Sequence, residues 1–116
     1  MTDEADKRLR RAADCTEKAH IRHEIDRLDR ALLVLFAERQ TYVRRMAEIK
    51  QHPDEAYDQH RIDAMLADLR ALAESLGLEA EQVEAVWQVL IDWNVAYEQR
   101  TIAARTGLSL TAVSLK

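Results

Sequence analysis

The chain contains very few of the residues that interrupt helices. Among its 116 residues there are only two glycines and one proline, while 47% of the residues are hydrophobic. Glycine and proline mark turns and loops, and no series of alternating apolar and polar residues indicates strands. A chain of this length forms one domain. The sequence therefore predicts a single all-α domain.

Cysteines and long apolar runs are equally scarce. Cys15 is the only cysteine, so no internal disulfide can form, and it has no metal-ligand spacing with the four scattered histidines. No run of about 18 apolar residues could span a bilayer. The beginning of the chain, MTDEADKRLRRAAD, lacks the apolar core of a signal peptide. We therefore expect a cytoplasmic protein with no membrane partner, no metal and no cofactor.

An excess of positive charge is also missing. Charged residues make up 33% of the chain, but the formal net charge is -4. Such a surface is well solvated and lacks the basic patch with which proteins bind phosphate backbones. A role in nucleic-acid binding is therefore not expected.

What the chain does contain is helical periodicity in three stretches, at residues 14–50, 57–76 and 80–104. Asp14 and Glu17 have the spacing of a capping box at the start of the first stretch. The only proline lies in the intervening segment QHPDEA. Gly77 and Gly107 follow the second and third stretches, where glycine commonly ends a helix.

The two ends of the chain show no such order. Residues 1–13 are charged and have no amphipathic pattern, so we expect them to be disordered. Residues 107–116 form a short tail to which the sequence assigns no position. The helical domain would then comprise residues 14–106.

The first predicted helix is unusually long for so small a chain. About 35 residues at 1.5 Å per residue extend over roughly 50 Å, which is more than the two remaining helices can cover. Its uncovered apolar stripe would need another surface. The sequence therefore predicts a homodimer.

Polar residues occupy positions where apolar stripes should continue. In the first helix the stripe of Ile21, Ile25, Leu28, Leu32 and Phe36 leads to Arg39 and Lys50. In the third helix the stripe of Val83, Trp87, Leu90 and Ile91 leads to Asn94 and Glu98. Burying a charge without a partner costs several kcal/mol, so these side chains indicate either mutual pairing or a polar, anionic ligand. In a third interpretation, Arg39 extends along the helix flank into solvent.

Together, several spaced residues resemble the all-helical chorismate mutase family, which includes isochorismate pyruvate-lyase. The resemblance covers about residues 14–102 and rests on the segments IRHEIDRLDRALLVLFAERQTYVRRMAEIK, DQHRI and LIDWNVAYEQR. The matching positions are Arg22, Arg39, Lys50, Asp58 and Arg61. The resemblance implies an intertwined dimer of three-helix chains, with a catalytic arginine borrowed from the partner subunit.

The resemblance also implies a role for each matching residue. Arg22 would enter the partner's site, while Arg39 and Lys50 would serve their own chain's site. Because Arg39 and Lys50 are eleven residues apart, about three turns, they would project from one helix face, with Arg22 about 100° around the helix. Arginine suits a dicarboxylate substrate because its guanidinium group binds a carboxylate through two hydrogen bonds.

The implied reaction is the pericyclic rearrangement of chorismate to prephenate, which leads to phenylalanine and tyrosine. It needs no nucleophile, because the protein holds a folded substrate conformer and stabilises negative charge on the breaking ether oxygen. Lys50 would contact this oxygen and one carboxylate. Arg61, Asp58, Asn94 and Ile62 would complete the substrate-binding set.

Two positions depart from the usual mutase pattern. Ile62 follows Arg61, where mutases often have a glutamate that receives the substrate hydroxyl, and this change is more typical of the lyase branch. Asp58, in contrast, fits the mutase pattern. Glu98, as in some fungal mutases, stands where many bacterial members have a glutamine that donates a hydrogen bond to the ether oxygen. The resemblance therefore implies a catalytic role for Glu98, although a one-residue shift would place Gln99 there.

Three functions therefore remain open from the sequence. The first is a chorismate mutase, and the second is an isochorismate pyruvate-lyase that forms salicylate from nearly the same pocket. The third is a non-catalytic helical dimerisation module in which the inward charges pair with one another. The product formed from each acid would distinguish the two enzymes.

Overall fold

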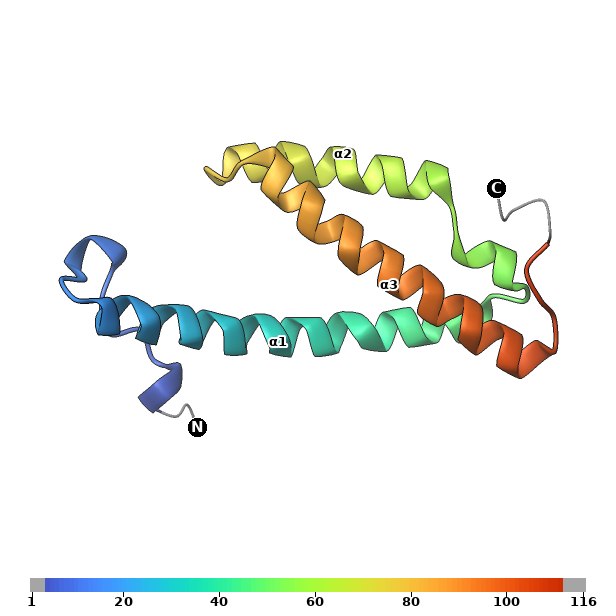
Figure 1. Cartoon of the computed structure of the whole chain (residues 1–116), viewed down its shortest axis with the longest axis horizontal. Coiled ribbons are helices and arrows are strands. Elements are labelled where there is room, and N and C mark those ends of the chain that lie inside the picture. Colours follow the sequence, from blue (N-terminus) through green and yellow to red (C-terminus); the bar gives the residue numbers. More distant parts are fainter. Residues whose placement is uncertain (1–3, 112–116) are drawn as a thin grey trace. The chain divides into compact units, whose positions relative to one another are not determined.

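The computed structural model describes residues 4–111, which form three α-helices and three short 3-10 helices. The α-helices are α1 (Lys18–Ile49), α2 (Gln59–Ser75) and α3 (Ala80–Thr106) (Figure 1). The 3-10 helices are η1 (Glu4–Asp6), η2 (Ala12–Asp14) and η3 (Pro53–Ala56). The all-α prediction is confirmed. The described residues divide into two compact units, with the boundary inside α1 between Tyr42 and Val43.

Helix α1 is long, as predicted, but it begins later than expected. The predicted capping box does not form, because Asp14 ends η2 and accepts a hydrogen bond from Arg11 Nε at 2.9 Å. Glu17 pairs instead with His20, at 3.0 Å from Nε2. The capping-box prediction was therefore wrong, because each carboxylate binds a nearby side chain instead of a main-chain N–H group at the start of the helix.

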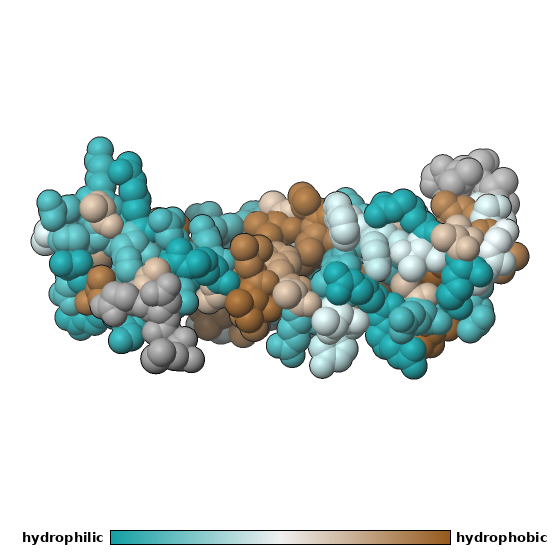
Figure 2. All heavy atoms as spheres, turned by 90° about the horizontal axis from the view of Figure 1, so that it is seen from below, coloured by the Kyte–Doolittle hydropathy of each residue, from teal (hydrophilic) through white to brown (hydrophobic). Residues whose placement is uncertain are grey.

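The apolar stripe of α1 is about half exposed. Ile21, Ile25, Leu28, Leu32 and Phe36 retain 41–51% of their accessible surface. The view in Figure 2 shows apolar side chains gathered on the surface. Contiguous apolar patches of this kind mark interaction sites in proteins. Within residues 4–111, no helix combines the length and the apolar character that a bilayer crossing requires.

The connection between α1 and α2 is an ordered turn. His52 caps η3, because its ring Nδ1 accepts a hydrogen bond from Asp54 N at 3.1 Å. The Glu55 carboxylate accepts in return from His52 N at 2.8 Å. Pro53 takes the first helical position, where its missing N–H is not needed. This turn packs against α3.

Glycines end both later helices, as predicted. Gly77 has φ 76° and Gly107 has φ 75°, values that a residue with a Cβ adopts at a cost. Leu78 N donates to Ala73 O at 2.8 Å, and Gly77 N donates to Glu74 O at 3.1 Å. These two bonds form the Schellman arrangement that satisfies the last carbonyls of α2.

Helices α2 and α3 pack against each other, and their inner faces supply most of the small core of the second unit. Its apolar part consists mainly of alanine and isoleucine, namely Ala47, Ala56, Ile62, Ala73, Ala80, Ile91 and Ile102. Two polar residues of α3, Asn94 and Glu98, are also buried. The predicted inward stripe of α3 is therefore confirmed, including its polar members.

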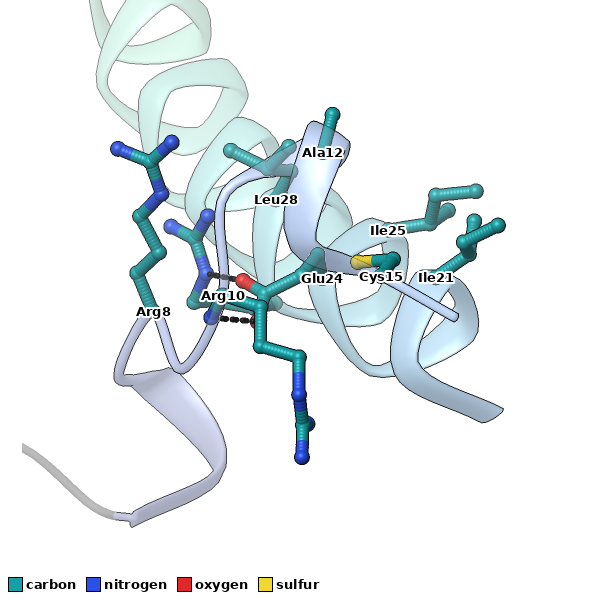
Figure 3. Close-up of a pocket in the computed structure, with 9 residues that line it drawn as sticks. Arg8, Arg10, Ala12, Cys15, Ile21, Glu24, Ile25 and Leu28 are labelled. Carbon is teal, nitrogen blue, oxygen red and sulfur yellow. Dashed lines mark hydrogen bonds and ion pairs between the residues drawn. The ribbon is translucent and has the colours of Figure 1, made fainter. Parts of the chain in front are cut away.

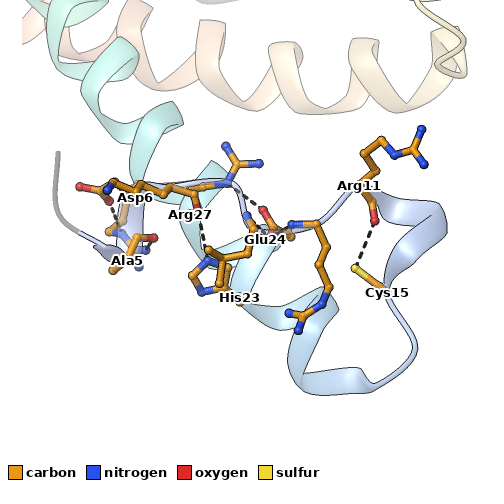
Figure 4. A network of polar contacts seen from close by, with 11 residues as sticks. Ala5, Asp6, Arg11, Cys15, His23, Glu24 and Arg27 are labelled. Carbon is orange, nitrogen blue, oxygen red and sulfur yellow. Dashed lines mark hydrogen bonds and ion pairs between the residues drawn. The ribbon is translucent and has the colours of Figure 1, made fainter.

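In the first unit, residues 4–17 fold back onto α1 as an N-terminal arm. Both carboxylate oxygens of Glu24 are used: Oε2 accepts from Leu9 N and Arg10 N, and Oε1 accepts from Arg27 Nε at 2.9 Å. Farther along α1, Arg30 contacts Asp6 and the carbonyl of Ala5, the two arm residues that Figure 4 labels at this end of the network. The described part of the arm is thus hydrogen-bonded to α1, whereas the composition of residues 1–13 predicted disorder. Residues 1–3 lie outside the described part of the chain.

Candidate functional site

The centre of the candidate site is an ion pair between the end of α1 and the middle of α3. Lys50 directly follows the last residue of α1, and its Nζ lies 2.7 Å from Glu98 Oε1. The two side chains retain only 20% and 11% of their accessible surface. Periodicity predicted that both would face inward, and the structure brings them together from positions 48 residues apart.

Asn94 lies one turn before Glu98 on the same face of α3. It is 5% exposed, and neither Oδ1 nor Nδ2 of its amide has a hydrogen-bond partner among the described residues. An unsatisfied buried amide costs about 1–3 kcal/mol, so such groups usually bind something that the protein does not itself supply. Asn94 therefore provides one donor group and one acceptor for an oxygen-rich ligand or for water.

The beginning of α2 contributes the remaining candidates of the second unit. Asp58 is the N-cap of α2, where its Oδ1 accepts from Arg61 N at 3.0 Å. This contact gives Asp58 a structural role that the substrate-binding prediction did not include. The Arg61 side chain is exposed, whereas Ile62 is buried at 7% exposure. Ile62 thus belongs to the apolar core of the second unit, and its role toward a substrate stays a prediction.

Two predicted cations lie in the first unit, on α1. Arg22 is exposed and Arg39 is half-buried. Within residues 4–111, neither forms an ion pair with an acidic side chain, in contrast to Arg27 and Arg30 on the same helix. Their roles at the site remain predictions.

The chemistry available to Lys50, Glu98 and Asn94 is that of binding and charge stabilisation. An ammonium group has three donors, so Lys50 can contact Glu98 and still donate to a ligand oxygen. Glu98 orients Lys50 by accepting from it. Within the described residues, no three His, Cys, Asp or Glu side chains come together as a metal site would require.

Sequence reasoning missed one residue near this ion pair. Arg105, near the end of α3, donates from Nη2 to the carbonyl oxygen of Ala47 at 3.0 Å and also to the carbonyl of Lys50. Because both acceptors belong to the main chain, no pattern of side chains could have indicated these contacts.

A cavity of about 570 Å³ lies between the N-terminal arm and α1 (Figure 3). Its apolar lining comprises Ala12, Cys15, Ile21, Ile25 and Leu28, and its charged lining includes Arg8, Arg10, Glu24 and Arg27. Three of the apolar residues belong to the uncovered stripe of α1. None of the residues predicted to bind substrate lines this cavity.

Glu24, at the edge of this cavity, has a strongly perturbed acidity. Burial opposes its ionisation, but hydrogen bonds from Leu9 N, Arg27 and Arg10 N outweigh burial and lower its pKa from 4.5 to about 2. A carboxylate with a lowered pKa contributes stability above its unfolded-state pKa and loses that contribution as the pH falls through its folded-state pKa. The contribution of Glu24 should therefore disappear between pH 4.5 and about 2.

We expect Glu24→Gln to lower the free energy of unfolding by an amount that depends on pH. Urea titrations of both proteins should differ most above pH 4.5 and converge toward pH 2, because wild-type Glu24 becomes protonated there. Glu48→Gln is the matched control, since Glu48 pairs with Arg45 while both side chains are at least 60% exposed. A difference for Glu24→Gln that is the same at every pH would contradict the prediction.

Two comparisons with known proteins each match most of this chain. The sequence pattern of the family described as Chorismate mutase type II matches residues 21–99. An isochorismate pyruvate lyase of Pseudomonas aeruginosa is 34% identical over 83 residues, which cover 72% of this chain and 82% of that protein. Residues 21–99, which match the family pattern, include Lys50, Asn94 and Glu98.

Proposed function

We propose that this chain, which belongs to the chorismate mutase type II family, rearranges chorismate to prephenate at the Lys50–Glu98 site. The observation that carries the proposal is the buried Asn94 amide without a partner, one turn from the Lys50–Glu98 pair. A structural ion pair alone would not need this amide. A ligand with both a hydroxyl group and acceptor oxygens would satisfy both of its polar atoms, because Oδ1 accepts and Nδ2 donates.

In the proposed mechanism the protein acts by position and charge. The substrate carries two carboxylates and an ether oxygen on which negative charge grows as the C–O bond breaks. Lys50 donates to this oxygen, where a fixed cation in a site of low dielectric stabilises the transition state more than the ground state. Glu98 keeps the ammonium group in place. Asn94 binds a polar group of the folded conformer, so that the ends of the new C–C bond lie close together.

The proposal assigns the two carboxylates to arginines. Arg39 of the same chain and Arg22 of a second copy are the candidates, with Arg61 at the start of α2 as a further cation. Support for a second copy comes from the apolar stripe on α1, whose members are about half exposed within one chain. Covering this stripe would remove apolar surface from water, which stabilises association by about 25 cal/mol per Å².

Isochorismate pyruvate lyase activity is the second candidate, and Ile62 favours it. A buried isoleucine cannot accept a hydrogen bond from a ring hydroxyl, which the corresponding glutamate of many mutases would do. The 34% identical relative bears the lyase name. The lyase reaction breaks the same type of ether bond and releases pyruvate, so the same cations would serve it.

The ion pair itself agrees with the third interpretation, a non-catalytic dimerisation module with internally paired charges. That interpretation supplies no protein partner for the Asn94 amide, and a purely structural core usually places an apolar residue at such a position. It also predicts no turnover of either acid.

Product analysis tests the proposal directly. We expect the purified protein to form prephenate from chorismate, with a rate proportional to enzyme concentration. Isochorismate is incubated separately and analysed for salicylate and pyruvate by chromatography. Prephenate as the main product supports the mutase, whereas salicylate and pyruvate from isochorismate without prephenate from chorismate would overturn it. The Lys50→Ala variant serves as the control for contaminating host enzymes.

A further inference from the structure

The carbonyl groups at the end of α1 are bound by Arg105 of α3. The last carbonyls of a helix have no partner within the helix, and the negative end of the helix dipole lies there. Gln51 N, which could continue the helix toward Ala47 O, donates instead to Glu55 Oε2 at 2.8 Å. The guanidinium of Arg105 takes its place, with Nη2 3.0 Å from Ala47 O and in contact with the carbonyl of Lys50.

The spacing along α3 gives this contact its significance. Glu98 and Arg105 are seven residues apart, or about two turns, so they lie on the same side of the helix. Glu98 binds the side chain of Lys50, and Arg105 binds its carbonyl. One face of α3 therefore holds Lys50 at both its main chain and its ammonium group.

The segment after α3 holds the adjoining turn in a similar way. Thr111 N donates to Asp54 Oδ1 at 3.0 Å, and the Thr111 hydroxyl contacts Oδ2 of the same carboxylate. Asp54 belongs to η3, which follows Lys50 by only a few residues. The turn after Lys50 is thus fixed at Asp54, while its beginning is fixed by Arg105.

We propose that Arg105 is a positioning residue that sets the place of the Lys50 ammonium group by binding the Lys50 and Ala47 carbonyls. It acts through Lys50 and does not touch substrate. The inference rests on the proposed function of the Lys50 site. Its consequence is that catalysis depends on a residue outside the pattern of spaced side chains that indicates the family.

Kinetics of Arg105→Ala provide the first test, with Arg100→Ala as the matched control. Arg100 is an exposed arginine of the same helix that lies over the Trp93 ring, 5.9 Å from its centroid. We expect Arg105→Ala to lower kcat about 10- to 100-fold with little change in KM, because a small displacement of a catalytic group weakens transition-state binding. Arg105→Lys should recover part of kcat, since an ammonium group can donate to the carbonyls.

An NMR measurement of the lysine side chains tests the same proposal without the reaction. The chain has few lysines, and the signal of the Lys50 ammonium is assigned by its loss in Lys50→Arg. We expect Arg105→Ala to move this signal in the direction seen in Glu98→Gln, whereas Arg100→Ala leaves it in place. Circular dichroism and thermal melts confirm that each variant is folded. If Arg105→Ala does not fold, Arg105→Gln and Arg105→Lys serve for both measurements.

A kcat for the folded variant within about two-fold of the Arg100→Ala control would overturn the proposal. An unchanged Lys50 signal would overturn it as well. If the wild-type protein converts neither acid, the proposed function fails, while the NMR comparison still decides whether Arg105 positions Lys50.

Discussion

Lys50→Met is expected to reduce kcat/KM about 10²- to 10³-fold, because it removes the cation that faces the charge developing on the ether oxygen. Methionine keeps the length and apolar contacts of the lysine stem, so the substitution removes mainly charge and donors. The loss should appear in kcat rather than in KM alone, since the interaction strengthens in the transition state. Steady-state kinetics of chorismate conversion measure both quantities.

The same substitution also removes the partner of Glu98, which is 11% exposed. Leaving a largely buried carboxylate without its ammonium partner should cost about 1–3 kcal/mol of folding free energy. Lys50→Met combined with Glu98→Gln removes both charges and should recover most of that stability. Activity should stay as low as in the single variant, because the cation is still missing.

This pair of variants separates catalysis from folding. Arg45→Ala is the control for loss of a cation from α1, because Arg45 pairs with Glu48 at the surface and should affect neither property appreciably. A double variant that regains both stability and activity would contradict the assignment of Lys50. A single variant that loses stability but keeps its rate would favour the interpretation of the ion pair as purely structural.

Local features of the fold were predictable from the sequence because their causes lie within a few residues. Gly77 and Gly107 end their helices through a backbone conformation that glycine adopts without steric cost. The start of α1 was not predictable in the same way. Asp14 can cap a helix or bind Arg11, and nothing in the sequence ranks those two local contacts.

The order of the N-terminal arm depends on contacts that periodicity cannot detect. Leu9 N and Arg10 N bind a carboxylate that follows them by 14 or 15 residues, and main-chain donors leave no mark on the sequence. The composition of residues 1–13 therefore predicted disorder. Its described part is instead held by Glu24 and Arg30 of α1.

The candidate site also combines residues that could be predicted from the sequence with residues that could not. Asn94 and Glu98 could be predicted to face inward because their spacing continues an apolar stripe, and both are buried. Mutual pairing was one of the expectations, but the choice of Glu98 as the partner of Lys50 needed the fold, since the two residues are 48 positions apart. Arg105 could not be found from spacing, because its acceptors are carbonyl groups.

Mixing two inactive variants should restore activity if the proposed site combines residues from two copies of the chain. In a two-fold symmetric dimer, Arg22 of one subunit would act with Arg39 of the other. A mixed dimer of Arg22→Ala and Arg39→Ala chains would then contain one site with both lesions and one site with neither. Neither parent dimer contains an intact site.

The expected recovery follows from random reassortment after brief denaturation and refolding of an equimolar mixture. Half of the dimers would be mixed and half of their sites intact, so about a quarter of the wild-type rate should return. The matched control mixes Arg39→Ala with Lys50→Ala chains, which the proposal assigns to one and the same subunit's site, so that no intact site can form. Native mass spectrometry verifies that mixed dimers are present. Mixed dimers of Arg22→Ala and Arg39→Ala chains without recovered activity would mean that the two arginines do not meet across a subunit interface. Equal recovery in the control mixture would show that Arg39 and Lys50 serve different sites.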